Sequence, residues 1–455
     1  MMSAASEHKA RVCVVGAGPS GLIMARSLMR AGADVVVYER HSDVGGIWDP
    51  DNSGSPIYES AHFISSRFTS GFYGYPMPDT FPDYPGYKLL RDYIRDFATV
   101  FGLYEQVKLN TGVAKAELVD GGWHVTDTRG ETAVYTHLVC ANGVTWTPRL
   151  PNYPGLEGFT GETRHSSTFR YPEELNGKRV LIVGGGNSGV DIACDAARNA
   201  DAAFWSVRRG YRIIPKHIFG VPLDVFLNEG GQPPAGVVVP EDPSELIDAL
   251  VGDLTKYGLP EPDHAALTSH PLVNDAIVHH LSHGDIAGKP DVAEFRGDTV
   301  VFTDGSEEKI ELVLFATGYD YEIAFVDQEL FQWNAGHPLL YLNMFNREVD
   351  NLYVLGFIEF ADAAYHRFDE MAQLIAFDIT AHGENKRWFN ELKRTDVPDM
   401  RGGMEYINTP RHANYVETHT FQHVLEEMRK QFAIEPLTED SFDPLRHDSP
   451  SSLAE

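Results

Sequence analysis

Two glycine-rich turns are the residues of this sequence whose types and spacing most plainly suggest chemistry. They are Gly16–Gly21 (GAGPSG) and Gly184–Gly189 (GGGNSG). In such a turn the first glycine permits a tight bend, the second lets the backbone approach a pyrophosphate, and the third lets the following helix pack close to the preceding strand. The helix N-terminus then directs backbone N–H groups at the phosphates. Each turn predicts a dinucleotide site if a strand precedes it and a helix follows.

Both turns lie in the sequence context that such a site needs. Around the first turn the pattern predicts a buried strand, a helix and a second strand, at residues 11–15, 22–30 and 34–39. Around the second turn the same order recurs, at residues 178–183, 190–198 and 202–207. The sequence therefore predicts an α/β protein with two Rossmann-like dinucleotide-binding domains.

The residues that end the strand after each turn differ in charge. Glu39 ends the first of these strands, and a carboxylate there accepts hydrogen bonds from a ribose 2′-hydroxyl but would repel a 2′-phosphate. The second strand ends with no acid but with Ser206, Arg208 and Arg209, and guanidinium groups hold a phosphate through paired hydrogen bonds. We therefore expect FAD at the first turn and NADPH at the second.

The net charge disfavours some classes of partner. With 37 basic and 66 acidic residues, the chain has a formal charge of −29. Nucleic acid and anionic membranes are bound mainly through clustered Lys and Arg, so neither is expected as a partner. The sequence has no apolar run long enough to cross a membrane and no apolar signal core near its start. We expect a cytoplasmic protein whose residues 435–455 form a polar, poorly packed tail.

The cysteines and one histidine cluster do not indicate a metal or dithiol site. The three cysteines are scattered and include no CxxC pair, which argues against a zinc site and against a disulfide reductase, another class with paired dinucleotide turns. His279, His280 and His283 have a spacing that a helix can use for zinc, but no second cluster or carboxylate partner is evident. We expect no bound metal.

Between the two turns lies a motif that resembles the fingerprint of the flavin-containing monooxygenases, the class B flavoprotein monooxygenases. The pattern FxGxxxHxxx(Y/F) is matched by Phe159, Gly161, His165 and Phe169. The resemblance runs from about residue 11 to residue 383. Three further segments carry it: Gly45–Trp48, Ala316–Tyr319 and Glu370–Gln373.

The resemblance implies an FAD domain interrupted by an NADPH domain. The expected bounds are 1–170 for the first part of the FAD domain, 171–319 for the NADPH domain and 320–434 for the second part of the FAD domain. The FAD-binding residues expected from the turn and the resemblance together are Gly16, Gly18, Pro19, Ser20, Gly21, Glu39, Arg40, Gly46, Ile47, Trp48, Val113 and Gln373. Those expected for NADPH are His165, Gly184, Gly186, Asn187, Ser188, Gly189, Ser206, Arg208, Arg209, Thr317 and Gly318.

The resemblance also implies a reaction. NADPH reduces the flavin, the reduced flavin combines with O2 to give a hydroperoxide, and a small nitrogen- or sulfur-containing nucleophile attacks the distal oxygen. The protein must exclude water while the peroxide waits for its substrate. His165 is then expected to support the position of NADPH from the linker between the domains rather than to transfer protons. A homodimer is the family-level expectation.

One stretch departs from the family pattern at the expected active site. Ile64 aligns where the family has an asparagine that hydrogen-bonds near the flavin peroxide, and an isoleucine can neither donate nor accept a hydrogen bond. His62, Ser65 or Ser66, or the substrate itself, could supply the missing polar contact, so these three residues are the catalytic candidates. Alternatively, the peroxide is short-lived and the enzyme releases hydrogen peroxide as an NADPH oxidase.

The sequence does not specify the substrate. A Baeyer–Villiger monooxygenase, which directs the same peroxide at ketones, usually has Trp where Phe169 stands in this chain. A redox sensor that reports NADPH occupancy is the non-enzymatic alternative. Tyr75, Met77 and residues 215–227 are the candidates for the wall of the substrate pocket.

Overall fold

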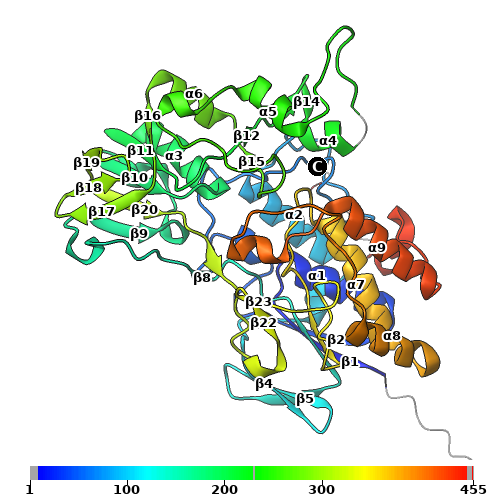
Figure 1. The fold of residues 1–455 in the computed structure, drawn as a ribbon. Helices are drawn as coiled ribbons and strands as arrows, with labels where there is room; N and C mark the ends of the chain where they lie inside the picture. The colour runs from blue at the N-terminus through cyan, green and yellow to red at the C-terminus, as the bar shows by residue number, and fades with distance from the viewer. Residues whose placement is uncertain (1–8, 229–230, 448–452, 454–455) are drawn as a thin grey trace, which may run out of the picture.

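Two five-stranded parallel sheets form the core of the protein. The structure is a computed structural model that describes residues 9–228, 231–447 and 453. The strand order is β24-β7-β1-β2-β3 in the first sheet and β16-β11-β10-β20-β9 in the second. The two sheets lie in separate bodies of the ribbon, with the second sheet at the left of Figure 1. The predicted α/β class with two Rossmann-like units is confirmed.

The first sheet joins strands that are far apart in the sequence. Its strands are β1 (Arg11–Val15), β2 (Asp34–Tyr38), β3 (Val107–Lys108), β7 (His137–Cys140) and β24 (Leu352–Val354). Apolar side chains of β1, β7 and β24 are buried because helices or loops cover both faces of the sheet. The principal helices of this unit are α1 (Pro19–Arg30), α2 (Tyr87–Val100) and α7 (Tyr365–Thr380). Since the second sheet is completed before β24 is reached, the second unit is an insertion into the first.

The second sheet repeats the arrangement of the first. Its strands are β9 (Glu162–His165), β10 (Arg179–Val183), β11 (Ala202–Ser206), β16 (Ile286–Lys289) and β20 (Leu312–Phe315). Its principal helices are α3 (Asn187–Asn199) and α6 (Ala276–His283). Strand β9 pairs with β20 and so belongs to this sheet, although it precedes the expected domain boundary at residue 171.

Smaller elements flank or connect the two sheets. One antiparallel sheet extends the first unit through β4 (Val113–Val119), β5 (Gly122–Asp127) and β6 (Thr132–Tyr135). Another extends the second unit through β17 (Val292–Arg296), β18 (Thr299–Phe302) and β19 (Glu307–Lys309). The connection between the units is a short antiparallel pair, β8 (Thr147–Pro148) with β21 (Tyr319–Asp320). A further short pair is β22 (Trp333–Asn334) with β23 (His337–Pro338).

An excursion after β11 reaches back toward the first unit. It contains β12 (Ile213–Ile214), β13 (His217–Ile218), β14 (Val221–Pro222), α4 (Leu223–Asn228) and α5 (Pro243–Val251), and β12 pairs with β15 (Leu272–Val273). The Tyr84 hydroxyl donates to the Lys216 carbonyl, and His217 Nε2 lies 3.0 Å from a carboxylate oxygen of Asp83. The excursion is therefore fastened to the first unit by polar contacts.

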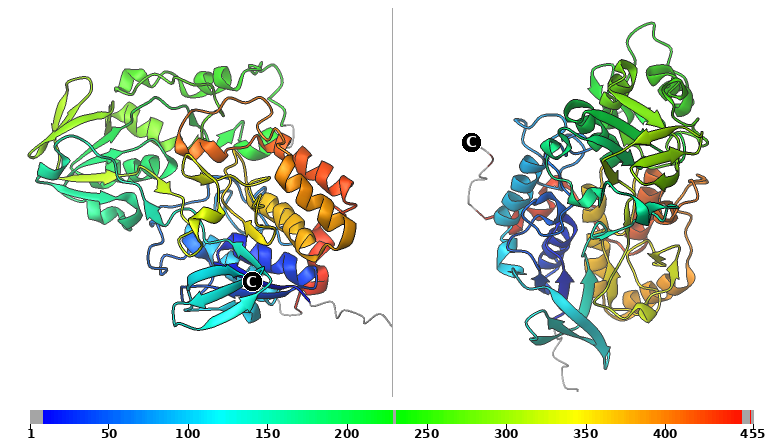
Figure 2. Two further views of the ribbon diagram at one scale, coloured as in Figure 1. Left: turned by 60° about the horizontal axis from the view of Figure 1, so that its bottom comes forward. Right: turned by 90° about the vertical axis from the view of Figure 1, so that its left-hand side faces the viewer.

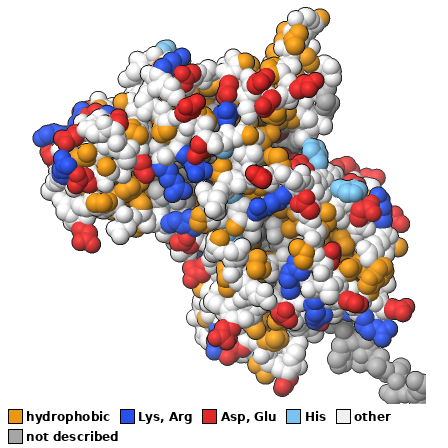
Figure 3. Space-filling view, in the orientation of Figure 1, with side chains coloured by type: hydrophobic (Ala, Val, Ile, Leu, Met, Phe, Trp, Pro, Cys, Tyr) orange, Lys and Arg blue, Asp and Glu red, His pale blue; other side chains and the backbone are white. Residues whose placement is uncertain are grey.

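The last part of the chain returns to the first unit. Helices α8 (Gly383–Thr395) and α9 (Thr418–Gln431) lie beside α7, as the orange and red ribbons of Figures 1 and 2 show. Among the described residues, no helix is long and apolar enough to cross a membrane. Acidic and basic side chains are interspersed on the face shown in Figure 3 rather than gathered into one basic patch.

The prediction of a poorly packed tail is wrong for residues 437–447. Phe442 is buried, and the Arg26 guanidinium lies 3.7 Å from the centre of its ring. Arg26 is itself fully buried and pairs with Asp369 at 2.7 Å. The Glu439 carboxylate accepts a hydrogen bond from the backbone N–H of Gly74 at 2.8 Å. The segment is polar in composition, but the buried Phe442 anchors it to the first unit. Residues 448–452 and 454–455 of the predicted tail lie outside the described residues.

Replacing Phe442 by alanine should therefore destabilise the first unit. Loss of a buried phenyl ring is expected to lower the free energy of unfolding by about 3 kcal/mol, measured by urea denaturation. Phe68 provides a matched control because its side chain is 48% exposed, so Phe68→Ala should have little effect. Equal effects of the two substitutions would contradict the packing described for the C-terminal segment.

Candidate functional site

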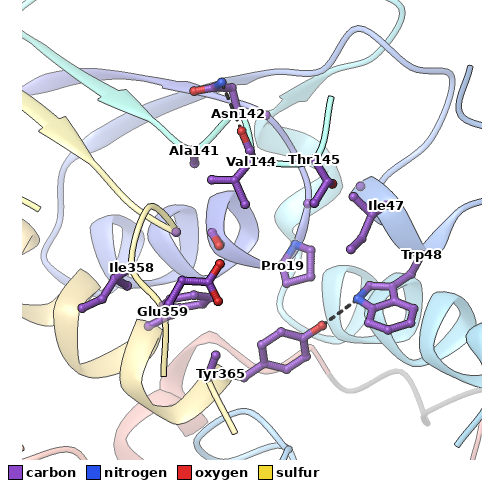
Figure 4. A pocket seen from close by; sticks show the side chains of 18 of the residues that line it. Pro19, Ile47, Trp48, Ala141, Asn142, Val144, Thr145, Ile358, Glu359 and Tyr365 are labelled. Carbon is purple, nitrogen blue, oxygen red and sulfur yellow. Dashed lines mark hydrogen bonds between the residues drawn. The ribbon is translucent and has the colours of Figure 1, made fainter. Parts of the chain in front are cut away.

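A cavity of about 830 Å³ opens at the carboxyl ends of β1 and β2. Ligands of open α/β sheets bind at this edge because the turns that follow the strands meet there. The second unit supplies part of the wall through Ile214, Leu223 and Val273. The cavity therefore lies between the two units, next to the first glycine turn. Figure 4 shows it from close by.

The first glycine turn has the close backbone contacts that its sequence predicts. Gly16 has a φ of +104°, and a Cβ there would lie 2.5 Å from the Ala141 carbonyl oxygen. A Cβ on Gly21 would lie 1.8 Å from the Gly16 carbonyl oxygen, so no larger residue fits. No side chain caps the N-terminus of α1. Gly18, Pro19 and Ser20 line the cavity, which makes this helix end available to a phosphate.

Glu39 is held at the end of β2 by backbone groups. It is buried, and its carboxylate accepts hydrogen bonds from the N–H groups of Ala17 at 2.7 Å and His41 at 2.9 Å. A carboxylate oxygen has capacity for further hydrogen bonds, so Glu39 can also accept from a ribose hydroxyl. The neighbouring Arg40 lies over the ring of Trp146, 4.3 Å from its centre. Both Glu39 and Arg40 line the cavity, as expected for FAD-binding residues.

Two buried polar atoms in the cavity wall have no partner within the described part of the chain. They are Asn142 Oδ1 and Thr145 Oγ1, and both residues follow β7. A buried polar atom without a partner is costly, so these two atoms fit a polar ligand such as the diphosphate or ribityl chain of FAD. Neither residue is among those predicted from the sequence. A signal was present in the sequence, because the apolar run at residues 138–140 leads directly into Asn142 and Gly143.

An aromatic wall stands beside the turn. Trp48 Nε1 donates to the Tyr365 hydroxyl at 3.0 Å, the contact drawn dashed in Figure 4. The Phe63 ring lies 5.2 Å from that of Trp48 and 5.6 Å from that of Tyr365, measured between ring centres. Such a wall excludes water and suits the flat ring system of a flavin. Ile47, Gly46 and Val113, which were also expected at this site, line the cavity as well.

The structure separates the three catalytic candidates. Ser65 lines the cavity, and Ser70 donates a hydrogen bond to its hydroxyl oxygen at 2.8 Å. Ser66 is fully buried, and its backbone N–H donates to Asp224 at 2.7 Å. His62 is exposed and does not line the cavity. Ile64 does line it, so the position that departs from the family pattern faces the site.

Three other expected residues do not reach the cavity. Gln373 is buried on α7, where its side-chain amide donates to the Glu435 carbonyl at 2.7 Å. Tyr75 and Met77, expected in the substrate wall, belong to the hydrophobic core of the first unit. From residues 215–227, Leu223, Asp224 and Leu227 do line the cavity.

The second glycine turn repeats the geometry of the first. A Cβ on Gly184 would lie 2.3 Å from the Ala316 carbonyl oxygen, and one on Gly189 would lie 2.3 Å from the Gly184 carbonyl oxygen. No side chain caps α3, whose N-cap residue is Gly186. The ring of Tyr211 covers Gly185, since a Cβ there would lie 2.1 Å from it. The turn thus presents an uncapped helix end outside the cavity lining.

Asn187 is used inside the protein. Its side-chain amide donates to the Pro271 carbonyl at 3.0 Å, and its carbonyl oxygen accepts from the Val273 N–H at 3.2 Å. Pro271 and Val273 both line the cavity. The first residue of α3 therefore holds a cavity-lining segment, in addition to lying at the expected pyrophosphate site.

The residues expected at the 2′-phosphate differ in availability. Arg208 is exposed and has no ion pair or hydrogen bond with the described residues. The Arg209 guanidinium lies 3.7 Å from the Asp263 carboxylate. Ser206 is buried, and its hydroxyl donates to the Pro290 carbonyl at 2.6 Å. The geometry leaves Arg208 free to bind an anion but uses the Ser206 hydroxyl within the fold.

His165 joins the expected linker between the domains to the segment at Gly318. Its Nδ1 accepts from the Ser167 N–H at 3.1 Å, so Nε2 carries the proton and donates to the Gly318 carbonyl at 3.0 Å. Burial lowers the pKa of His165, which keeps the ring neutral. The neighbouring Thr317 hydroxyl donates to the Arg149 carbonyl at 2.5 Å. Both ring nitrogens of His165 are occupied, so the arrangement favours a linking role over proton transfer.

An ion pair between the partly buried Glu359 and the exposed Arg411 lies near the aromatic residues. The Glu359 carboxylate accepts from the Tyr321 hydroxyl at 2.9 Å and from Arg411 at 3.1 Å. Burial alone would raise the pKa of Glu359, but the charge of Arg411 and the hydrogen bonds from Arg411 and Tyr321 lower it to about 2. In Figure 4, Glu359 lies across the cavity from Trp48. The sequence offered no local signal for this pair because its members are 52 positions apart.

The histidine cluster of α6 has an ordinary structural environment. His280 Nδ1 lies 2.9 Å from a carboxylate oxygen of Asp285, and the rings of His279 and His283 lie against each other. Within the described ranges, no three His, Cys, Asp or Glu side chains form a group that could hold a metal ion.

Comparisons with known proteins agree with this geometry. Residues 9–376 match the model of the family described as Flavin-binding monooxygenase-like. Flavin-containing monooxygenase 5 of Oryctolagus cuniculus is 32% identical over 376 residues, which are 77% of this chain and 69% of the relative.

Two solved structures share the fold. S-allyl-L-cysteine S-oxygenase from Allium sativum superposes with a TM-score of 0.65 and 19% identity, over 95% of this chain and 90% of that one. The OTEMO complex with FAD and NADP superposes with a TM-score of 0.61 and 19% identity, over 84% of each chain.

These findings decide between the broad enzyme classes that paired dinucleotide turns allow. The family match extends through both glycine turns, the fingerprint and the strand that closes the first sheet. The glycine turns at the ends of α1 and α3 fit FAD and NADPH, and the family match shows that the protein is a flavin-binding monooxygenase. This chain belongs to the flavin-containing monooxygenase family.

Proposed function

We propose that this monooxygenase oxygenates a small nitrogen- or sulfur-containing nucleophile by way of a hydroperoxide of its bound flavin. The observation that carries the proposal is the apolar end of the cavity, where residues of both units meet. Its walls there include Phe63, Ile64, Ile214, Leu223 and Leu227. A reactive oxygen species survives longest where water is excluded, and a small neutral nucleophile can enter such a space.

The bound flavin, once reduced by NADPH, supplies the activation of O2; the chain supplies position and shelter. We propose that Gly16, Gly18, Ser20 and Gly21 hold the FAD pyrophosphate, since they belong to the turn that leads into the uncapped end of α1, and Gly16, Gly18 and Ser20 line the cavity. Glu39 then accepts from the adenosine ribose. Trp48 and its aromatic neighbours exclude water from the far end of the cofactor.

At the second turn, the end of α3 holds the NADPH pyrophosphate and Arg208 holds the 2′-phosphate in this proposal. Arg208 is favoured because it is exposed and makes no ion pair or hydrogen bond with the described residues, whereas the Arg209 guanidinium lies 3.7 Å from the Asp263 carboxylate. Ser206 fixes the end of β11 instead, since its hydroxyl donates to Pro290.

Ser65 is the candidate that replaces the family asparagine. Because Ser70 donates to the Ser65 oxygen, the proton of Ser65 itself is available to a ligand in the cavity. Ser65 can therefore donate one hydrogen bond to a ligand, whereas Ile64 can donate none. A specific observation also favours leakage of hydrogen peroxide as the second candidate function, namely that Ile64 faces the cavity.

Replacing Arg208 by glutamate should raise the KM for NADPH at least tenfold, because one guanidinium–phosphate contact is lost and repulsion replaces it. The KM for NADH, which has no 2′-phosphate, should change less than threefold. Steady-state oxidation of both cofactors measures the two values. Arg198→Glu, at the exposed far end of α3, is the control; equal effects of Arg208→Glu on both cofactors would refute the assignment.

Replacing His165 by alanine should leave the FAD content unchanged but increase the hydrogen peroxide released per NADPH oxidised. The reason is that the hydrogen bonds of His165 with the Ser167 N–H and the Gly318 carbonyl join two segments that lie outside the FAD site. FAD absorbance and a peroxide assay measure the two quantities. Kinetics and peroxide yield identical to those of the unmodified enzyme would contradict the linking role.

The reaction class is tested with a panel of amines, sulfides and ketones, measuring product and hydrogen peroxide per NADPH. Product from amines or sulfides is expected, and Ser65→Ala should raise the peroxide yield severalfold while Ile64→Asn lowers it. Ser282→Ala on α6 is the control. Product from ketones alone would indicate Baeyer–Villiger chemistry instead. Peroxide equal to NADPH with every compound would indicate an oxidase.

A further inference from the structure

His270 lies where the second unit meets the C-terminal segment of the chain. It lines the cavity, and the residues after it, Pro271 and Val273, are held by the side chain of Asn187. The backbone N–H of His270 donates to His412 Nε2 at 2.9 Å. His412 and Tyr415 lie beyond residue 376, where the match to the family model ends. This chain therefore surrounds His270 with residues from outside the region matched to the family.

The hydrogen bonds around His270 determine which ring nitrogen carries the proton. The Tyr415 hydroxyl has one proton and donates it to the Phe360 carbonyl at 2.9 Å. Its oxygen lies 2.8 Å from His270 Nδ1, so it must accept a hydrogen bond from that nitrogen. Nδ1 of His270 therefore carries the proton, and Nε2 is left with a lone pair.

That lone pair is accessible. Nε2 of His270 has no hydrogen-bond partner among the described residues, and it is absent from the polar atoms that are both buried and unpartnered. The side chain is 13% exposed, and the surface that it exposes belongs to the cavity wall. His270 thus presents a hydrogen-bond acceptor to a ligand.

Burial and neighbouring charge keep the ring neutral. Burial lowers the pKa of His270 to about 3, and the positive charge of Arg411 contributes to the shift, although the Glu359 carboxylate lies 3.8 Å from Nδ1 and opposes it. The acceptor is consequently present throughout the neutral pH range. Protonation would abolish it, since imidazolium nitrogens only donate.

The position of His270 indicates which ligand group it meets. Asn187 is the first residue of α3, at the expected pyrophosphate site, and it directly holds the segment that follows His270. A dinucleotide that extends from this helix end into the cavity passes that segment with its nicotinamide end leading. The carboxamide of the nicotinamide carries the N–H donor at that end.

We propose that His270 Nε2 accepts a hydrogen bond from the nicotinamide carboxamide of NADPH, in a tautomer that Tyr415 fixes. This inference rests on the assignment of the second turn to NADPH. It makes His270 a positioning residue that selects the orientation of the nicotinamide ring in the cavity. The Glu359–Arg411 pair and Tyr415, which surround it, keep that acceptor in place.

The test measures equilibrium binding to the oxidised, FAD-loaded enzyme by calorimetry, without O2 turnover or substrate. The probes are NADP⁺ and its 3-acetylpyridine analogue, in which an acetyl group without an N–H replaces the carboxamide. For His270→Leu we expect the Kd of NADP⁺ to rise about tenfold and that of the analogue less than twofold. His270→Gln retains an acceptor and should stay within about threefold of the unmodified enzyme.

Two further variants keep the test decisive. Tyr415→Phe retains the aromatic contact but frees Nδ1, so an intermediate loss for NADP⁺ is expected. His279→Leu makes the same substitution on the exposed face of α6 and should change neither Kd. The proposal is overturned if His270→Leu weakens binding of both probes equally, which indicates a structural role, or weakens neither, which places the acceptor on another residue. Because no oxygenation is measured, failure of the proposed reaction would not affect this result.

Discussion

The close approach of backbone to backbone at the two glycine turns is the constraint on which the rest of the structure depends. A methyl group on Gly21 would come within 1.8 Å of the Gly16 carbonyl oxygen, and one on Gly189 within 2.3 Å of that of Gly184. Only at this distance does each helix begin directly over the end of its strand, so that its free N–H groups face a phosphate. The chain thereby acquires two uncapped helix ends, the first in the cavity wall and the second outside it, and the function requires that the two units keep one orientation.

Hydrogen bonds between the two units meet that requirement. The Ser66 N–H of the first unit donates to Asp224 in the excursion after β11, and the Tyr84 hydroxyl of the first unit donates to the Lys216 carbonyl in the same excursion. Each contact uses a backbone group on one side, so its geometry is set by the fold and not by a flexible partner. A rotation of the second unit would break both hydrogen bonds together, so they help to keep the two units in one orientation.

The sequence predicted what is local and missed what is long-range. The glycine turns, their strands and helices and the position of Glu39 follow from short patterns, and the structure contains them. Gln373 was expected at the flavin because of its motif, but its side-chain amide donates to the Glu435 carbonyl instead. The motif does not reveal this direction, because it depends on how α7 is rotated about its axis when it packs. Phe442 looked like part of a polar tail, since its partner Arg26 is more than 400 positions away. The Glu359–Arg411 pair is likewise formed only by the fold.

Ile64 illustrates how a lost polar contact and a gained apolar one can serve the same site. Its side chain packs against the cluster formed by Ile214, Ile247 and Val273, all contributed by the second unit. Burying an isoleucine stabilises such a contact by about 2 kcal/mol, more than one neutral hydrogen bond contributes on average. An asparagine at this position would bring an amide into that apolar contact, at a desolvation cost. Ile64 therefore makes an apolar contact between the two units, and the adjacent Ser65 hydroxyl is the polar group that faces the cavity.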